Sequence, residues 1–187
     1  MKQTIIAVIC FLCVSSLYIQ AQKINHPSLL YTPQRIQQVK QRMQHEPKLQ
    51  EAWGDIKRTA DEALQKKDFN RLDYLSLAYL MTDNKEYADV IKEILLKTVE
   101  AESWGDVEMM ARIPAWRSQL GMAHKSFLSA VGYDAAYNVM SSSERKKIAE
   151  GLKRLAVEPA LGDWLLEPTR IHSLNSMGHN WWTSCVC

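Results

Sequence analysis

Apolar residues recur at spacings of three and four along most of this chain, which is the period of a helix that buries one face. Thr32 before Pro33 predicts the start of a first helix, because threonine can cap a helix and proline fits its first turn. This helix should end near Gln44. Pro47 opens a second helix with apolar residues along one face, so we expect it to pack on one side only.

The next two helices differ in their patterns. A third helix is expected from about Asn70, with Asp73 as its capping partner, and its sequence LDYLSLAYLM is apolar almost all round. That composition predicts an inner, largely buried helix. Asp83, with Glu86 three residues later, predicts the start of a fourth, amphipathic helix that forms a hairpin with the third.

The helical pattern resumes at Ser118 and runs to about Tyr137 or Met140, and Ser141 with Glu144 forms a capping box for a sixth helix. No segment alternates apolar and polar residues as a half-buried strand does, so the chain is predicted to be all-α. Successive helical hairpins can form either a solenoid or a toroid around a central cleft. One face of the fifth helix is expected to carry the apolar residues Leu120, Phe127, Leu128 and Val131.

A connection from Ser103 to Arg117 interrupts the helices with a glycine and a proline. Arg112 and Arg117 flank Trp116 in this loop, and their guanidinium groups could bind carboxylates of the protein itself or of an acidic substrate. Long loops of this kind often carry function. The tryptophans outside the helical faces either pack into the core or face a ligand, and they are Trp104, Trp116 and Trp164.

The last fifteen residues, SLNSMGHNWWTSCVC, hold the densest group of candidate binding residues. Amide and imidazole groups that can form hydrogen bonds stand beside flat indole faces, which is a combination suited to a sugar ring. The alternative is a turn held by side-chain to backbone hydrogen bonds, since asparagine and glycine are turn residues. The candidates are Asn175, His179, Asn180, Trp181 and Trp182.

Residues 1–21 have the features of a secretory signal peptide: a positive start at Lys2, an apolar run, and a small residue, Ala21, for cleavage. The mature chain, residues 22–187, is then expected to be secreted or periplasmic and to have no membrane anchor. Only Lys2 of the 23 basic and none of the 21 acidic residues leave with the signal, so the mature chain is almost neutral. Such a balance gives no field that attracts nucleic acid.

Metal and nucleotide chemistry find no support in the sequence. Residues 22–187 contain no HExxH, C-x-x-C or glycine-rich phosphate loop, since the C-x-x-C of Cys10 and Cys13 lies within the first 21 residues, and four of the five histidines are scattered. His172 and His179 could share a helix face, but ordinary polar histidines are the simpler interpretation. We therefore expect no cofactor. His26 and His45 are interpreted as surface residues.

Three stretches together resemble secreted heparinase II/III-like polysaccharide lyases: HPSLLYTPQRIQQVKQRM, GYDAAYNVMSSSERKKIAEGL and HNWWTSCVC. In that family an incomplete (α/α) toroid precedes a β-sandwich. The resemblance implies that residues 22–187 form the first part of the toroid, with the sandwich absent from this chain. The chain would then be an inactive fragment of a longer enzyme.

The resemblance also implies a reaction, β-elimination on an acidic, uronate-containing polysaccharide. A side chain that neutralises the uronate carboxylate stabilises the charge that develops when the C5 proton is removed, and a Tyr or His transfers protons. By position the neutralising role falls on Asn180 and His179. The expected substrate-binding residues are Trp181, Trp182, Arg112, Trp116, Arg117 and Asn175. The base and acid would follow Cys187.

Two other functions are compatible with the sequence. A glycoside hydrolase on a related toroid would need two carboxylates across the cleft, and the loops offer Asp106, Glu108, Asp163 and Glu167. A non-catalytic helical protein that binds carbohydrate or acts as a scaffold would need none of them.

Overall fold

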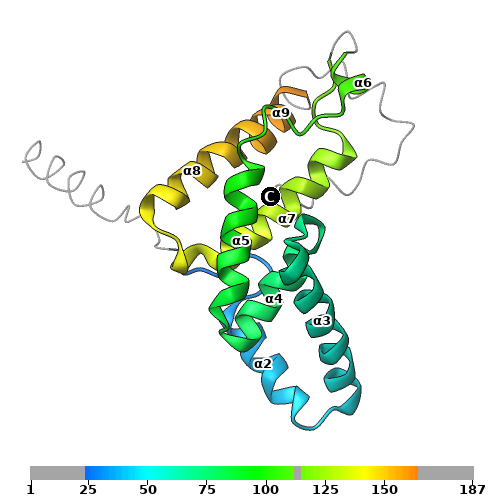
Figure 1. Cartoon of the computed structure of the whole chain (residues 1–187), viewed down its shortest axis with the longest axis vertical. Coiled ribbons are helices and arrows are strands. Elements are labelled where there is room, and N and C mark those ends of the chain that lie inside the picture. The colour runs from blue at the N-terminus through cyan, green and yellow to red at the C-terminus, as the bar shows by residue number, and fades with distance from the viewer. Residues whose placement is uncertain (1–23, 112–114, 164–187) are drawn as a thin grey trace, which may run out of the picture.

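The computed structural model describes residues 24–111 and 115–163, and every regular element in these residues is a helix (Figure 1). This confirms the all-α class. The elements in chain order are α2 (Pro33–Met43), α3 (Pro47–Lys66), η1 (Phe69–Arg71), α4 (Leu72–Thr82), α5 (Lys85–Thr98), α6 (Val107–Met110), α7 (Leu120–Ala136), η2 (Tyr137–Val139), α8 (Ser142–Leu152), η3 (Lys153–Val157) and α9 (Glu158–Leu161).

Local capping signals placed several helix starts correctly. The Thr32 hydroxyl accepts a hydrogen bond from the Arg35 amide at 3.3 Å, so α2 begins where the Thr-Pro pair predicts. At α8 the predicted capping box is complete. The Ser141 hydroxyl accepts from the Glu144 amide at 3.2 Å, and the Glu144 carboxylate accepts from the Ser141 amide at 2.8 Å.

The predicted caps of the third and fourth helices were wrong by a few residues. A 3₁₀ turn, η1, precedes α4, and its cap is Asp68, whose carboxylate accepts from the Asn70 amide at 2.9 Å. Asp83 does not start α5 but ends α4 in the left-handed region at φ 55°, which a short polar side chain tolerates. Asn84 caps α5 instead, accepting from the Glu86 amide at 3.1 Å.

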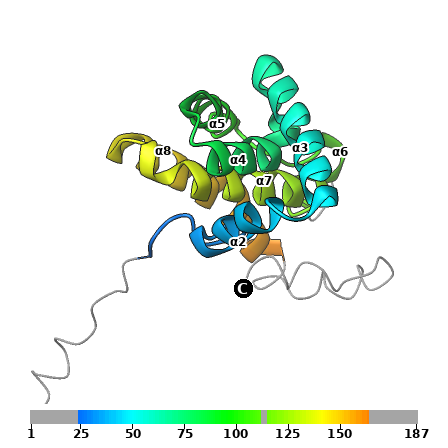
Figure 2. The ribbon, with the colours of Figure 1, turned by 90° about the horizontal axis from the view of Figure 1, so that it is seen from below.

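The core lies where α4 meets α5 and α7. α4 is apolar almost all round because it also packs against α3, so the prediction of an inner helix is confirmed. Gly132 of α7 permits a close approach, since a Cβ there would lie 3.3 Å from side-chain atoms of Leu72 and Ile91. Figure 2 shows α4 and α7 between α5 on one side and α2 with the orange end of the chain on the other.

The buried face of α7 differs from the one the sequence predicts. Leu128 and Val131 are buried, but Leu120 is 60% exposed and Phe127 is 44% exposed. Val131, which shares this face one turn after Phe127, is buried, so among the described residues the face is covered along the C-terminal half of α7 and exposed along its N-terminal half.

α8, η3 and α9 follow one another without a break, and η3 is a π-helical turn. Pro159 lies at the start of α9, and its missing amide hydrogen is a common cause of such a change in helix geometry. Gly151 lets α8 approach α5, because a Cβ there would lie only 2.4 Å from the Cβ of Val99. Arg154 donates to the main-chain oxygens of Val99, Ala101 and Glu102 at 2.9–3.0 Å, which satisfies carbonyls just after the end of α5.

The N-terminal segment, residues 24–31, is tied to the far end of α7 by Asp134. This buried carboxylate accepts from the Ser28 amide at 2.8 Å, from the Leu29 amide at 2.8 Å and from the Ser28 hydroxyl at 3.3 Å. It also contacts Nδ1 of His26 at 2.5 Å. The interpretation of His26 as a surface residue was therefore wrong, since its ring also stacks on Tyr137 with centroids 3.8 Å apart.

Candidate functional site

The loop between α5 and α7, residues 99–119, is folded back on itself by main-chain contacts and short caps. The Asp106 carboxylate caps α6 by accepting from the Glu108 amide at 2.9 Å, and the Trp116 amide donates to the Met109 oxygen at 2.9 Å. Trp104 is buried, and its indole nitrogen donates to the Thr98 oxygen at 3.3 Å. Of the two possibilities for Trp104, the structure shows core packing.

The end of this loop is held by Asp163, at the C-terminal end of the described chain. One carboxylate oxygen accepts from the Arg117 amide at 2.6 Å, from the Ser118 amide at 2.7 Å and from the Ser118 hydroxyl at 3.0 Å. The other oxygen lies 3.3 Å from Nε of Arg117. The Asp163 side chain is only 1% exposed, so these charge-assisted bonds act with little competition from water.

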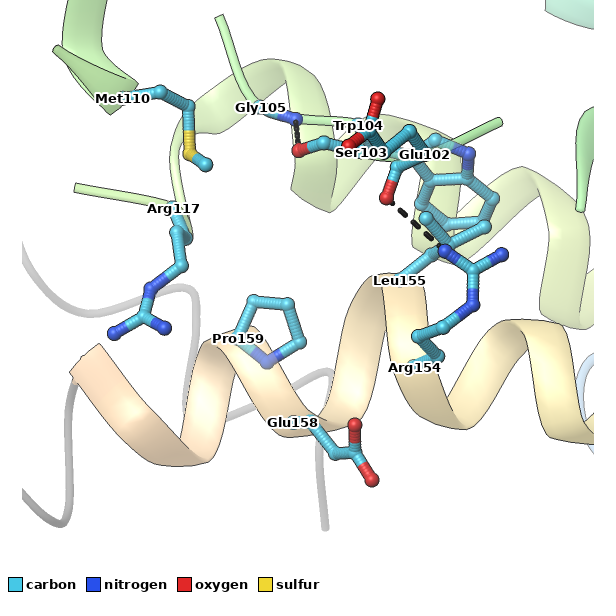
Figure 3. A pocket seen from close by; sticks show the side chains of 10 residues that line it. All are labelled: Glu102, Ser103, Trp104, Gly105, Met110, Arg117, Arg154, Leu155, Glu158 and Pro159. Atoms are coloured by element: carbon cyan, nitrogen blue, oxygen red, sulfur yellow. Dashed lines mark hydrogen bonds between the residues drawn. The ribbon is translucent and has the colours of Figure 1, made fainter. Parts of the chain in front are cut away.

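Arg117 therefore pairs with a carboxylate of the protein, which is one of the two alternatives that the sequence left open. Its side chain remains partly exposed and lines an open pocket of about 230 Å³ between the loop and the helix of η3 and α9 (Figure 3). Two arginines and two glutamates balance the charge of the pocket. The lining residues are Glu102, Ser103, Trp104, Gly105, Met110, Arg117, Arg154, Leu155, Glu158 and Pro159.

Two buried donors stand beside Arg117 at the start of α7. The indole nitrogen of Trp116 and the amide nitrogen of Gln119 are both inaccessible to water, and neither finds a hydrogen-bond partner within the part of the chain that the structure describes. Gln119 is also the N-cap residue of α7, where its side chain makes no capping bond. Both donors lie beneath the surface, so an acceptor oxygen from solution could reach them only after neighbouring side chains had moved.

The remaining candidates lie outside the described residues: Arg112, Trp164, Glu167, Asn175, His179, Asn180, Trp181 and Trp182. The structure does fix the point from which the last five continue, because Asp163 is bonded to the residues that begin α7. The α5–α7 loop and Asp163, the last described residue, consequently lie at the same end of α7.

The described residues show neither a cluster of metal ligands nor a membrane-spanning helix. Within residues 24–111 and 115–163, no three His, Cys, Asp or Glu side chains are grouped so as to hold a metal ion. None of the helices described has the length and hydropathy that a bilayer-spanning helix needs. Comparison with protein-family models, with curated proteins and with solved structures gave no match.

The sequence analysis did not identify the roles of two buried carboxylates, Asp134 and Asp163, which bind segments distant in the sequence. Asp134 was not singled out, and Asp163 was considered only as an acid of the alternative hydrolase. Both precede or follow apolar helical residues and look like ordinary polar positions. One signal was available, because Asp134 lies within GYDAAYNVM and its partners lie within HPSLLYTPQRI, two of the stretches on which the family resemblance rests.

Proposed function

We propose that this chain is the N-terminal helical part of an exported polysaccharide lyase-like protein of the heparinase II/III type. In the longer protein, the substrate would be an acidic, uronate-containing polysaccharide and the reaction β-elimination. The residues of the family resemblance support this proposal, and so does the contact between two of the three stretches, in which Asp134 accepts from the Ser28 and Leu29 amides. The proposed location is outside the cytoplasm, secreted or periplasmic, as the first 21 residues indicate.

The arrangement of helices supports a partial (α/α) toroid. From α3 onward, the longer helices alternate between amphipathic ones, α3, α5 and α8, and central ones that are apolar on most sides, α4 and α7. α4 and α7 pack directly against each other, and each also packs against the amphipathic helices beside it in sequence. An inner and an outer ring would arise from repeating this alternation.

The observation that carries the functional proposal is the contact of Asp163 with Arg117 and Ser118. It brings the loop with Arg117 and Trp116 to the point where the segment with His179 and Asn180 begins. Arg117 and Asp163, the residue from which the segment with His179 and Asn180 continues, therefore lie at one end of α7.

The proposed chemistry divides the work between charge neutralisation and proton transfer. Asn180 and His179 would donate hydrogen bonds to the uronate carboxylate, and this lowers the cost of the negative charge that forms when C5 loses its proton. A base takes that proton, and an acid protonates the departing oxygen of the 4-linked sugar. Trp181 and Trp182 would stack on sugar rings, with Asn175, Arg112, Trp116 and Arg117 binding the polar groups around them. No metal is required for this route.

The hydrolase alternative finds less support in the side chains that it would use. Asp163 is buried and already accepts several hydrogen bonds, and Asp106 caps α6. A catalytic carboxylate needs access to the glycosidic oxygen or to water. Of the four acids considered, only Glu108 is described and exposed without such a role in capping or in buried contacts.

The test follows the ultraviolet absorbance of unsaturated uronates released from heparan sulfate, chondroitin and alginate. We expect the longest form of the protein that the gene encodes to release them, and residues 22–187 alone to release none. Asn180→Ala and His179→Ala should each reduce the rate at least tenfold, which corresponds to about 1.4 kcal/mol of transition-state stabilisation, and a chelator should leave it unchanged.

Asn70→Ala is the matched control, because Asn70 is exposed at the 3₁₀ turn and distant in sequence from the candidate groups. The proposal fails if the long form leaves all three polysaccharides intact, or if Asn180→Ala and Asn70→Ala have the same rate. Clear turnover by residues 22–187 would instead show that the chain is no inactive fragment.

A further inference from the structure

A strip of exposed side chains runs along the N-terminal half of α7, and it is mostly apolar. Leu120, His124 and Phe127 are spaced by four and three residues, so they project from one face of the helix. Leu120 is 60% exposed and Phe127 is 44% exposed. We call these three residues the α7 strip. Single exposed apolar residues need no explanation, but two large ones on one face of a central helix do.

The neighbouring outer helix also shows apolar side chains to solvent. Val157 is 47% exposed and Leu161 is 40% exposed, and their spacing of four places them on one side of η3 and α9. Ala156 and Ala160, next to them in sequence, pack against the core. The last inner and the last outer helix of the described chain thus both have an uncovered apolar side.

The chain continues from a point beside this surface. Asp163 is bonded to the amides of Arg117 and Ser118, and Ser118 is two residues from Leu120. Along the helix axis Leu120 and Phe127 are only about 10 Å apart, which a few residues of chain can span. A few residues after Asp163 are therefore long enough to reach both ends of the strip.

The composition of that segment matches the surface. Residues 164–187 contain large apolar side chains in every part, and they include few charges. Besides Trp181 and Trp182, which the proposed function assigns to sugar rings, the large apolar residues are Trp164, Leu165, Leu166, Ile171, Leu174 and Met177. Burial of such side chains against an exposed apolar face is favourable for both partners.

We propose that residues 164–187 dock on the α7 strip and cover Leu120 and Phe127. The location of Asp163, the short reach and the apolar content of the segment favour this occupant over a second copy of the chain, which would have to meet the strip from solution. The inference does not depend on the proposed reaction. It concerns which surface the segment with Asn180 and His179 rests on, whatever these residues do.

The test uses photo-crosslinking from the strip. Cys185→Ser and Cys187→Ser remove the only cysteines after residue 21, and His124→Cys then provides a single attachment point for a benzophenone maleimide. His124 is exposed, so the substitution leaves Leu120, Phe127 and the core intact. The matched control is Asp89→Cys, which is exposed on α5, the helix on the other side of α7 (Figure 2).

After illumination, peptide mapping of residues 22–187 should find adducts within residues 164–187 from position 124, severalfold more than from position 89. Adding Phe127→Asp should reduce those adducts severalfold, with the helical circular dichroism signal unchanged. Equal adduct yields from the two positions, or adducts that join two chains, would overturn the proposal. Since no activity is measured, failure here and failure of the proposed lyase function are separate results.

Discussion

Removal of the Asp134 carboxylate tests whether the N-terminal segment is a fixed part of the fold. In Asp134→Ala, the Ser28 and Leu29 amides and the His26 ring lose a shared, buried acceptor. We expect the segment to leave its site on α7 and the protein to lose stability. The helices themselves should remain, because Asp134 packs at the end of α7 and not in the contact of α4 with α5.

The size of the effect can be bounded from the contacts. A hydrogen bond to a charged group contributes about 1.5–3 kcal/mol, but the Ser28 and Leu29 residues are exposed, so water can replace part of what they lose. We therefore expect a loss of roughly 2–4 kcal/mol in the free energy of unfolding, below a simple sum over four donors. With a typical urea dependence of about 2 kcal/mol per molar, the midpoint should fall by about 1–2 M.

Urea unfolding followed by circular dichroism measures this change, and hydrogen exchange at the Leu29 amide shows whether the segment has left. Asp134→Asn should lose less, because one acceptor oxygen remains. Asp89→Asn, a change in an exposed pair with Lys92, should stay within about 0.5 kcal/mol of the unmodified protein. An unchanged midpoint in Asp134→Ala, with the Leu29 amide still protected, would refute the reasoning.

Three further predictions concern packing, helix capping and pH. Gly151→Ala should destabilise the folded protein by about 1–3 kcal/mol, because the new Cβ would collide with Val99. Gly54→Ala has open space around it and should stabilise the folded protein by about 0.5–1 kcal/mol. Urea midpoints that shift in the same direction in both variants would contradict this. Arg154→Met should cost about 0.5–1.5 kcal/mol, measured by thermal unfolding, because three carbonyl oxygens lose their donor and water replaces it only in part; an unchanged midpoint would count against it. Burial, and then the nearby aspartate charge, raise the pKa of the Tyr31 hydroxyl to about 12. The stabilisation of the folded state by neutral Tyr31 is therefore complete below pH 10 and is lost as the pH rises through 12. Tyr31→Phe should flatten the loss of stability at alkaline pH, and an unaltered pH profile of the unfolding free energy would exclude Tyr31 as its source.

Local signals in the sequence predicted most helices, but they did not predict which faces of those helices are buried by neighbouring elements. Ser141 and Glu144 act within four residues, so the start of α8 could be read directly. Whether Leu120 and Phe127 are buried depends on which helices stand beside α7, and periodicity carries no information on that. At Asp83 the sequence pattern fitted two adjacent roles, the end of one helix and the start of the next, and only the backbone conformation distinguishes them.

The candidate site illustrates the same limit. Loop residues such as Arg117 and Trp116 were identified because arginine and tryptophan are conspicuous there. Asp163 was considered only as an acid of the alternative hydrolase and not as the residue that holds the loop, because its partners Arg117 and Ser118 lie 46 and 45 residues earlier and no local pattern links them. Likewise, Trp104 could be assigned to the core only when its contact with the Thr98 oxygen was known.

The contacts of Asp134 also bear on the order in which the molecule forms and comes apart. They join residues separated by 105–108 positions, whereas the hairpins of α3, α4 and α5 bring together close neighbours in sequence. Closing so long a loop has an entropic cost that nearby helix pairs avoid, so docking of the N-terminal segment follows helix packing. Contacts made after the rate-limiting step mainly govern how fast the native state opens. The first described residues to be synthesised would then be the last to dock, and they would serve chiefly to slow unfolding.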